Sequence, residues 1–293
     1  MIKEKAHAKI NLFLNVVNKR FDGYHDLEMV MAPIDLHDML TFKKDNSGKI
    51  TVTSDIEITK KIEDNIVYKI AVFLQEDFQI SEGVEIHIKK NIPIAAGLAG
   101  GSADAAATFR ALNKLWKLRL SLEDMAKLAI NFGADIPFCI YSKLSIARGK
   151  GEELLFINKK LKTKILLVNP NVKISTKDVF SKVNKEDLEH VKITNMSSAI
   201  YNKNYEIMVR ELHNSLEKIA FENIEALGNL IKDIYPLTTY EAMNLIFRST
   251  VLALIQSVHL IQRGVDTKDW VNARFNSLLG DGLASALSSA NND

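Results

Sequence analysis

Cysteine is nearly absent from this sequence, and neither charge is in clear excess. The 293 residues include one cysteine, Cys139, so no disulfide can form within the chain. This cysteine lies in the apolar run IPFCIYS, which favours a buried, unreactive thiol over a nucleophile. Lys and Arg number 38 against 36 Asp and Glu, and no stretch combines basic with aromatic side chains. A nucleic-acid partner is therefore not expected.

Long hydrophobic runs are also lacking. The longest apolar segment, residues 249–262, is shorter than the ~20 residues that span a bilayer, and Arg248 and Arg263 flank it. The N-terminal residues contain no apolar core of the length found in signal peptides. We therefore expect a cytoplasmic protein with no membrane partner. The sequence carries no information on the oligomeric state.

The length of the chain predicts two domains. At 293 residues and 32.9 kDa, it exceeds the roughly 100–200 residues of a usual domain. A Gly- and Lys-rich stretch, residues 147–162, precedes the best candidate for a boundary, because no low-complexity linker is visible elsewhere. We expect an N-terminal domain at residues 1–155 and a C-terminal domain at residues 156–293.

Two periodicities alternate along the first half of the chain, which indicates an α+β fold. Alternating apolar and polar residues, or a continuous apolar run, predict strands at residues 9–17, 49–58, 83–92 and 164–170. Apolar residues at helical spacing predict helices at residues 65–78, 102–116 and 121–133. In the last of these, Ser121 is the expected N-cap, Asp124 completes a capping box, and Gly133 is the expected stop. From about residue 193 the chain is expected to be mostly helical.

A glycine-rich joint connects the third predicted strand to an alanine-rich helix. In PIAAGLAGGSADAAA (residues 93–107), Gly97, Gly100 and Gly101 precede a helix expected to begin at Ser102. Backbone N–H groups at such a helix start form an anion site, and glycine allows both close approach of a ligand and positive φ angles. The joint matches neither the P-loop nor the G-x-G-x-x-G fingerprint. A phosphate site and a plain glycine-rich helix start both fit it.

Four segments in a fixed order resemble the GHMP kinases. They are AKINLFLNV (residues 8–16), KRFDGYHDLEMV (19–30), PIAAGLAGGSADAAATFRALN (93–113) and FGADIPFCI (132–140). The resemblance extends from residue 2 to about residue 220. It implies an ATP-binding N-terminal domain of the ribosomal protein S5 domain 2-like type, a ferredoxin-like C-terminal domain, and phosphoryl transfer from ATP, with Mg²⁺, to a small-molecule alcohol. The AKIN and DGYH motifs further indicate a substrate that carries a cytidine diphosphate and belongs to the non-mevalonate route to isoprenoids.

Lys9 and Asp135 are the candidate catalytic residues. From the neighbouring residues alone, Lys9 fits an outward-facing residue of a strand, and Asp135 fits a capping or turn residue before Pro137. The resemblance instead implies that Asp135 is the base that takes the proton of the acceptor hydroxyl, and that Lys9 lies beside it. An ammonium group in that position keeps the carboxylate ionised and orients the hydroxyl.

The resemblance also implies binding roles. It implies an ATP site formed by Asn65, Pro93, Ile94, Ala95, Ala96, Gly97, Leu98, Ala99, Gly100, Gly101, Ser102 and Ala103. It implies a substrate site formed by Asn11, Tyr24, His25, Thr176 and Phe180. In that site a cytosine would stack between Tyr24 and Phe180, and His25 would form a hydrogen bond with the edge of the base. The alternative for Asn65 is a helix N-cap, and the alternative for residues 22–25 is a tight turn.

The chain departs from the family pattern in two places. His7 stands where the motif around Lys9 usually has proline. No glycine occurs from residue 229 to residue 263, where these kinases carry a third glycine motif, and residues 243–255 have instead the spacing of an amphipathic helix. The C-terminal region is therefore degenerate, altered by a shifted reading frame, or adapted to another use. Besides an active kinase, the sequence allows a kinase-fold protein that binds nucleotide without turnover, and a kinase of another alcohol.

Overall fold

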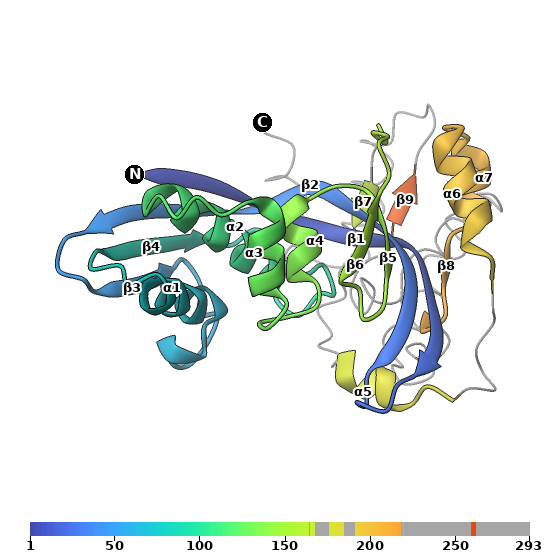
Figure 1. Ribbon diagram of the computed structural model, residues 1–293. Coiled ribbons are helices and arrows are strands. Elements are labelled where there is room, and N and C mark those ends of the chain that lie inside the picture. The colour runs from blue at the N-terminus through green and yellow to red at the C-terminus, as the bar shows by residue number, and fades with distance from the viewer. Residues whose placement is uncertain (164, 168–175, 185–190, 218, 220–258, 262–293) are drawn as a thin grey trace, which may run out of the picture.

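The computed structural model of the protein describes residues 1–163, 165–167, 176–184, 191–217, 219 and 259–261 (Figure 1). The altered third glycine motif at residues 243–255 lies outside these residues, so the helix predicted there is not tested. Most of the predicted C-terminal domain also lies outside them.

A mixed sheet forms the framework of the described chain. Its strands are β1 (Ile2–Lys19), β2 (His25–Asp45), β3 (Ile50–Ser54), β4 (Gly83–Lys89), β5 (Ser145–Arg148), β6 (Glu153–Phe156) and β8 (His213–Asn214). β1 and β2 form a long antiparallel hairpin within the strand order β3-β4-β2-β1-β8, while β5 pairs with β2 and β6 with β5. β8 runs parallel to β1 beside Phe13 and Leu14. β7 (Ile165–Leu167) and β9 (His259–Ile261) form a separate two-stranded sheet.

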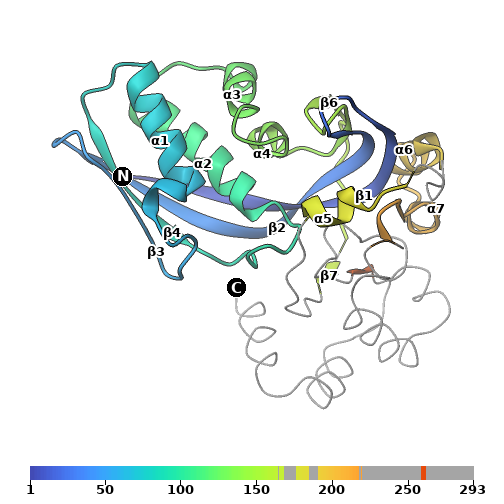
Figure 2. The ribbon, with the colours of Figure 1, turned by 90° about the horizontal axis from the view of Figure 1, so that it is seen from below.

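Four helices cover one face of the larger sheet (Figure 2). They are α1 (Ile66–Asp77), α2 (Gly100–Leu115), α3 (Leu122–Ala129) and α4 (Ile136–Tyr141), and a short 3-10 turn, η1 (Ile62–Asp64), precedes α1. Phe42 and Ile86 of the sheet, together with Leu74 and Phe109 of the helices, belong to one buried core. Each such side chain contributes roughly 1.5–3 kcal/mol by burial, so the core holds the start of α2 in a fixed place on the sheet.

Three short helices follow β7 in the chain. They are α5 (Thr176–Ser181), α6 (Ile193–Tyr201) and α7 (Tyr205–Arg210). α5 lies near the turn between β1 and β2, whereas α6 and α7 lie side by side at the end of the molecule opposite α1 (Figures 1 and 2). The larger sheet extends past the predicted domain boundary at residue 155, because β6 ends at Phe156 and β8 joins the sheet from residue 213.

A strand or helix of the predicted kind lies in each range predicted up to residue 170, and the capping box between Ser121 and Asp124 is present. The helices expected from about residue 193 include α6 and α7, but β8 and β9 are strands, and most of that region lies outside the described residues. α4, β5 and β6 were not predicted. α3 nevertheless ends at Ala129, so the expected stop at Gly133 is wrong. α2 begins at Gly100 rather than at Ser102. β2 is the longest of the described strands, and it was not predicted; only the turn that precedes it was.

The pairing between β1 and β2 is interrupted next to Lys9. His7 lies opposite His37, but Lys9 lies opposite Pro33, so β2 carries extra residues at this point. Such a bulge bends a strand and redirects the side chains around it. It therefore sets the direction of the residues on both strands beside Lys9.

The prediction of a buried thiol is confirmed. Cys139 lies in α4 with 4% of its surface exposed, and burial, followed by the charge of Asp135, raises the pKa of this thiol well above its ordinary range. A thiol held in its protonated form is a poor nucleophile. In the part of the chain that the structure describes, no helix has the length and apolar character needed to cross a membrane.

Candidate active site

Lys9 and Asp135 lie close together in the structure. The Lys9 Nζ is 3.6 Å from the Asp135 Oδ1, and the lysine side chain is 6% exposed whereas that of the aspartate is 37% exposed. The same Nζ donates a hydrogen bond to the Asn11 Oδ1 at 3.2 Å. Lys9 is therefore a buried strand residue and not a solvated outward one. The exposed aspartate gives this pair access to a ligand from solution.

Asp135 immediately precedes α4, but its carboxylate does not cap that helix. No hydrogen bond from its side chain to the α4 backbone is present, and Pro137 is in the first turn of α4. The capping alternative is therefore not what the structure shows. Because the oxygen atoms are not used by the helix, they can accept a proton or a hydrogen bond from a ligand.

The glycine loop, defined here as residues 93–101, packs against the strand that carries Lys9. The backbone N–H of Lys9 donates to the Leu98 carbonyl oxygen at 3.1 Å. Ala95, Gly97 and Ala99 have φ angles of 57°, 67° and 58°, so the loop repeatedly enters the left-handed region. The predicted positive φ is thus confirmed at Gly97. Ala99, the N-cap of α2, offers no side-chain cap, which leaves the first N–H groups of α2 available to an anion.

The two glycines that begin α2 have different surroundings. A Cβ at Gly100 would lie 3.1 Å from the Ile92 Cγ2, so this glycine allows close packing against the chain that precedes the loop. Among the residues that the structure describes, a Cβ at Gly101 would meet nothing within 4 Å. Gly101 therefore leaves space beside the start of α2, where a phosphate could bind.

A buried ion cluster lies directly behind the glycine loop. Lys90 forms ion pairs with Asp38 and with Asp104, the latter at 2.8 Å, and all three side chains are at most 4% exposed. Asp38 also accepts hydrogen bonds from the backbone N–H groups of Asn91 and Ile92. The cluster thus ties the end of β4 and the start of α2 to β2. The sequence analysis missed it, although Asp104 is a lone charge in an alanine-rich helix.

Stability should fall as pH rises because of Asp104. Burial is the main cause that raises the pKa of Asp104 to about 7, and Asp38 adds to it against the effect of Lys90. The folded protein therefore binds a proton between about pH 4 and pH 7 that the unfolded chain has released, so the free energy of unfolding should drop by on the order of 2 kcal/mol from pH 5 to pH 8. Urea unfolding at both pH values measures this drop.

Asp104→Asn is the control for this pH dependence. The variant keeps the shape of the side chain but cannot titrate, so its unfolding free energy should change less between pH 5 and pH 8 than that of the parent. Titrating groups far from Asp104 are common to both proteins and cancel in the comparison, so the difference in slope reports the cluster of Asp104, Asp38 and Lys90. Equal pH slopes in the two proteins would show that Asp104 does not titrate in this range.

The substrate-site residues from the sequence analysis lie in two groups. Asn11 is next to Lys9, and its Nδ2 is buried with no hydrogen-bond partner among the described residues. His25, at the start of β2, stacks on Phe180 of α5 with ring centroids 5.3 Å apart, and its Nε2 likewise has no partner in the described part of the chain. Burial lowers the pKa of His25. A neutral ring can both donate to and accept from the edge of a base.

Tyr24 points away from the core in this structure. It is 59% exposed, and the Lys150 Nζ lies 4.7 Å from the centre of its ring. Because Phe180 already contacts His25, no base can lie between those two rings without displacing one of them. The sandwich of a cytosine between Tyr24 and Phe180 remains a prediction. Thr176 begins α5, and its side chain lies outside what the structure describes.

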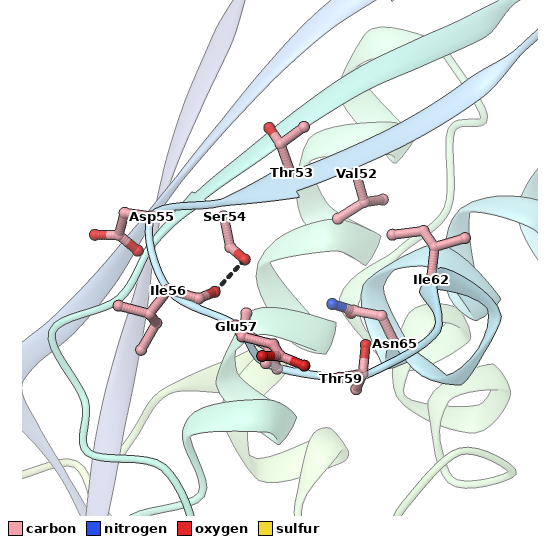
Figure 3. Close-up of a pocket in the computed structure, with 10 residues that line it drawn as sticks. Val52, Thr53, Ser54, Asp55, Ile56, Glu57, Thr59, Ile62 and Asn65 are labelled. Atoms are coloured by element: carbon pink, nitrogen blue, oxygen red, sulfur yellow. Dashed lines mark hydrogen bonds between the residues drawn. The ribbon is translucent and has the colours of Figure 1, made fainter.

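Asn65 caps a helix and also lines a pocket. Its Oδ1 accepts a hydrogen bond from the Val67 N–H at 2.9 Å, so it is the N-cap of α1. It also lines a pocket of about 370 Å³ between β3 and α1, and its amide nitrogen points into that pocket (Figure 3). Most of the remaining lining comes from residues 52–59. A planar base could be bonded there by the amide of Asn65.

Three comparisons with known proteins agree on one family. The sequence model of the GHMP kinases N terminal domain matches residues 65–143. Over 220 residues the chain is 43% identical to a protein of Staphylococcus aureus (strain MRSA252) that carries the name of a 4-diphosphocytidyl-2-C-methyl-D-erythritol kinase, and the match covers 75% of this chain and 78% of that protein.

Solved structures give the same result. A crystal structure of 4-(cytidine 5'-diphospho)-2C-methyl-D-erythritol kinase is similar with a TM-score of 0.75 and 27% identity, over 94% of this chain and 96% of that one. The mevalonate kinase of L. major in complex with R-mevalonate has a TM-score of 0.67 and 15% identity, over 94% and 92% of the two chains. The second similarity shows a shared fold only.

Proposed function

Because this chain belongs to the GHMP kinases, in the group of the 4-diphosphocytidyl-2-C-methyl-D-erythritol kinases, we propose that it transfers the γ-phosphoryl group of ATP to the 2-hydroxyl of that cytidine substrate. The observation that carries the proposal is the Lys9–Asp135 pair beside the glycine loop. The named relatives favour this activity over phosphorylation of another alcohol and over a protein without turnover. The product would feed isoprenoid precursor synthesis by the non-mevalonate route.

In this reaction Asp135 would act as the base. The oxygen of the substrate 2-hydroxyl attacks the γ-phosphorus, the bond from that phosphorus to ADP breaks, and the hydroxyl proton passes to Asp135. Lys9, with its Nζ 3.6 Å from this carboxylate, would balance the negative charge and orient the hydroxyl. Asn11 holds the Lys9 ammonium group from the other side. Its Nδ2, which has no hydrogen-bond partner among the described residues, would donate to the methylerythritol part of the substrate.

The glycine loop would bind the ATP phosphates. The open side of Gly101 and the uncapped N–H groups at the start of α2 fit an anion at this position. The neighbouring pocket with Asn65 would hold the adenine. Residues 93–103 and Asn65 together are the proposed ATP site.

Magnesium would accompany the ATP. Mg²⁺ prefers oxygen ligands and often keeps several waters, with a few carboxylates and the substrate phosphates completing its shell. At Lys9 and Asp135 the described residues offer no group of three metal-ligating side chains. We therefore propose that phosphates and water supply most of its ligands, with Asp135 as the available protein carboxylate. The ion would neutralise the charge on the phosphates.

The cytidine part of the substrate would bind between the hairpin turn and α5. Tyr24, His25 and Phe180 surround this position, and the cation of Lys150 beside Tyr24 suits the diphosphate. In the proposed stack the base would lie on the face of Phe180 that does not contact His25, with Tyr24 on its other side. The S5 domain 2-like N-terminal domain, the ferredoxin-like C-terminal domain and their boundary at residue 155 remain part of this proposal, as does the role of Thr176.

A coupled ADP-release assay tests the proposed function. With Mg-ATP present, turnover is expected with 4-diphosphocytidyl-2-C-methyl-D-erythritol and not with mevalonate or homoserine. Turnover with one of the other alcohols instead would reassign the acceptor. Mg-ATP binding without turnover on any of the three would favour the non-catalytic alternative.

Tyr24→Leu should raise KM for the cytidine substrate by roughly 5- to 100-fold and leave KM for ATP nearly unchanged. The loss of one stacking ring costs roughly 1–3 kcal/mol per base, which sets this range. Steady-state kinetics with each substrate varied in turn measure both constants. Tyr201→Leu, at another exposed tyrosine on α6, is the matched control. Equal increases in both KM values would contradict a role in base recognition.

A further inference from the structure

A cluster of two histidines and an aspartate lies beside the β2 bulge and has no role in the proposed reaction. His7 of β1 lies directly opposite His37 of β2, with ring centroids 5.2 Å apart. Asp35 lies on the bulged part of β2. One ligand atom from each of the three residues can be chosen such that all of them lie within 4.8 Å of one another. This spacing suits three ligands of one ion.

Both imidazole rings are already oriented by the backbone. The His7 Nδ1 is 3.1 Å from the Ile34 carbonyl oxygen, and the His37 Nδ1 is 2.5 Å from the Asp35 carbonyl oxygen. Because a carbonyl only accepts, each Nδ1 donates a proton in this contact, and each Nε2 is the ring nitrogen left for a metal ion. Metal-binding histidines are typically held in this way, with the second ring nitrogen donating to a carbonyl or carboxylate. The bulge therefore supplies one ligand, Asp35, and orients the other two.

We propose that His7, Asp35 and His37 bind a divalent transition-metal ion of the class of Zn²⁺, Co²⁺ and Ni²⁺. Two imidazole nitrogens and one carboxylate match the preference of these ions, whereas Mg²⁺ and Ca²⁺ prefer oxygen ligands alone. Three protein ligands leave a fourth tetrahedral position for water.

The position of the site gives the ion a structural consequence. His37 is adjacent to Asp38, which anchors the end of β4 through Asn91 and Ile92, and His7 is two residues before Lys9. An ion bound here would join β1 to β2 across the interruption in their pairing. It would thereby limit the relative movement of the strand that carries Lys9 and the strand that anchors the glycine loop.

Calorimetric titration of the full-length, EDTA-treated protein with ZnCl₂ tests the proposal. We expect one Zn²⁺ per chain, a rise in Tm on the order of 5 °C at a zinc concentration of 100 times Kd, and no such binding with MgCl₂ at the same concentration. His37→Ala should weaken zinc binding by at least the 10- to 100-fold that loss of a supporting residue typically costs. Co²⁺ should give visible absorption bands in the parent and not in this variant.

Two further variants separate metal binding from folding. Asp35→Asn changes an exposed side chain, so the variant should fold normally. Its affinity for zinc should nevertheless be lower than that of the parent. His87→Ala removes an exposed histidine of β4 that is outside the cluster and should bind zinc as the parent does. The proposal is overturned if the parent does not bind zinc, or if His37→Ala and Asp35→Asn both bind it with the affinity of the parent.

Discussion

Asp135→Asn should lower kcat by about 10²–10⁴-fold and leave the affinity for Mg-ATP nearly unchanged. A positioned base contributes about this factor, and asparagine has nearly the same shape but cannot take the proton of the hydroxyl. The side chain makes no helix cap, so its replacement should not disturb α4. Single-turnover kinetics report the loss in the chemical step, and calorimetric titration with a non-hydrolysable ATP analogue reports binding.

Lys9→Met provides the second half of this test. In the proposed mechanism Lys9 and Asp135 act on the same hydroxyl, so the double variant should lose little more activity than either single variant. Asp124→Asn, at the capping box of α3, is the matched control for a carboxylate at a helix start outside the pair, and it should keep kcat. Parent-like turnover of Asp135→Asn would remove this residue from the mechanism, and additive losses would assign the two residues to separate steps.

Gly101→Val should abolish the rise in Tm that Mg-ATP produces in the parent, while the variant without ligand stays folded. A Cβ at Gly101 meets nothing within 4 Å among the described residues, so the fold should tolerate the added side chain, which would fill space beside the start of α2. Phosphates that bind at the start of α2 need that space. In the parent, saturating ligand should stabilise the fold by on the order of 3 kcal/mol. Thermal unfolding with and without Mg-ATP measures the difference.

Gly100→Val would be a poorer test, although Gly100 belongs to the same motif. Its Cβ would lie 3.1 Å from Ile92, so the variant would disturb packing as well as any ligand. Glu76→Val is a better control, because it places valine on an exposed position near the end of α1, away from the loop. This control should keep the full rise in Tm. If Gly101→Val keeps it too, the loop is a helix start and does not bind phosphates.

The sequence predicts those elements whose signals are local. Alternation identified β3 and β4, and the capping box at Ser121 identified the start of α3. The end of α3 could not be read in this way. Phe132 packs against Phe73 and Phe109, with centroids 5.2 Å and 6.1 Å apart, and these contacts from other helices are absent from any local pattern. Gly133 therefore did not mark the end of α3, although its position in the sequence suggested that it would.

The difference between local signals and contacts of distant segments also explains which parts of the site were predictable. Lys9 and Asp135 occur in recognisable motifs, and the structure brings them together although they are 126 positions apart in the chain. Asp38, Lys90 and Asp104 form an equally close group, but no sequence pattern around any of them indicates which residues it pairs with. Nor could the sequence show that Gly100 and Gly101 have opposite surroundings, because that depends on where Ile92 packs.

The pairing of β8 with β1 bears on the order in which the protein is made and folded. β1 is complete after 19 residues of synthesis, yet the strand beside Phe13 and Leu14 is formed by residues 213 and 214. The bond from the Ser215 N–H to the Leu14 carbonyl oxygen closes later still. Until about residue 215 has emerged from the ribosome, this edge of β1 has free backbone groups that can pair with another chain. A nascent chain that stalls before that point would therefore aggregate through the strand that carries Lys9.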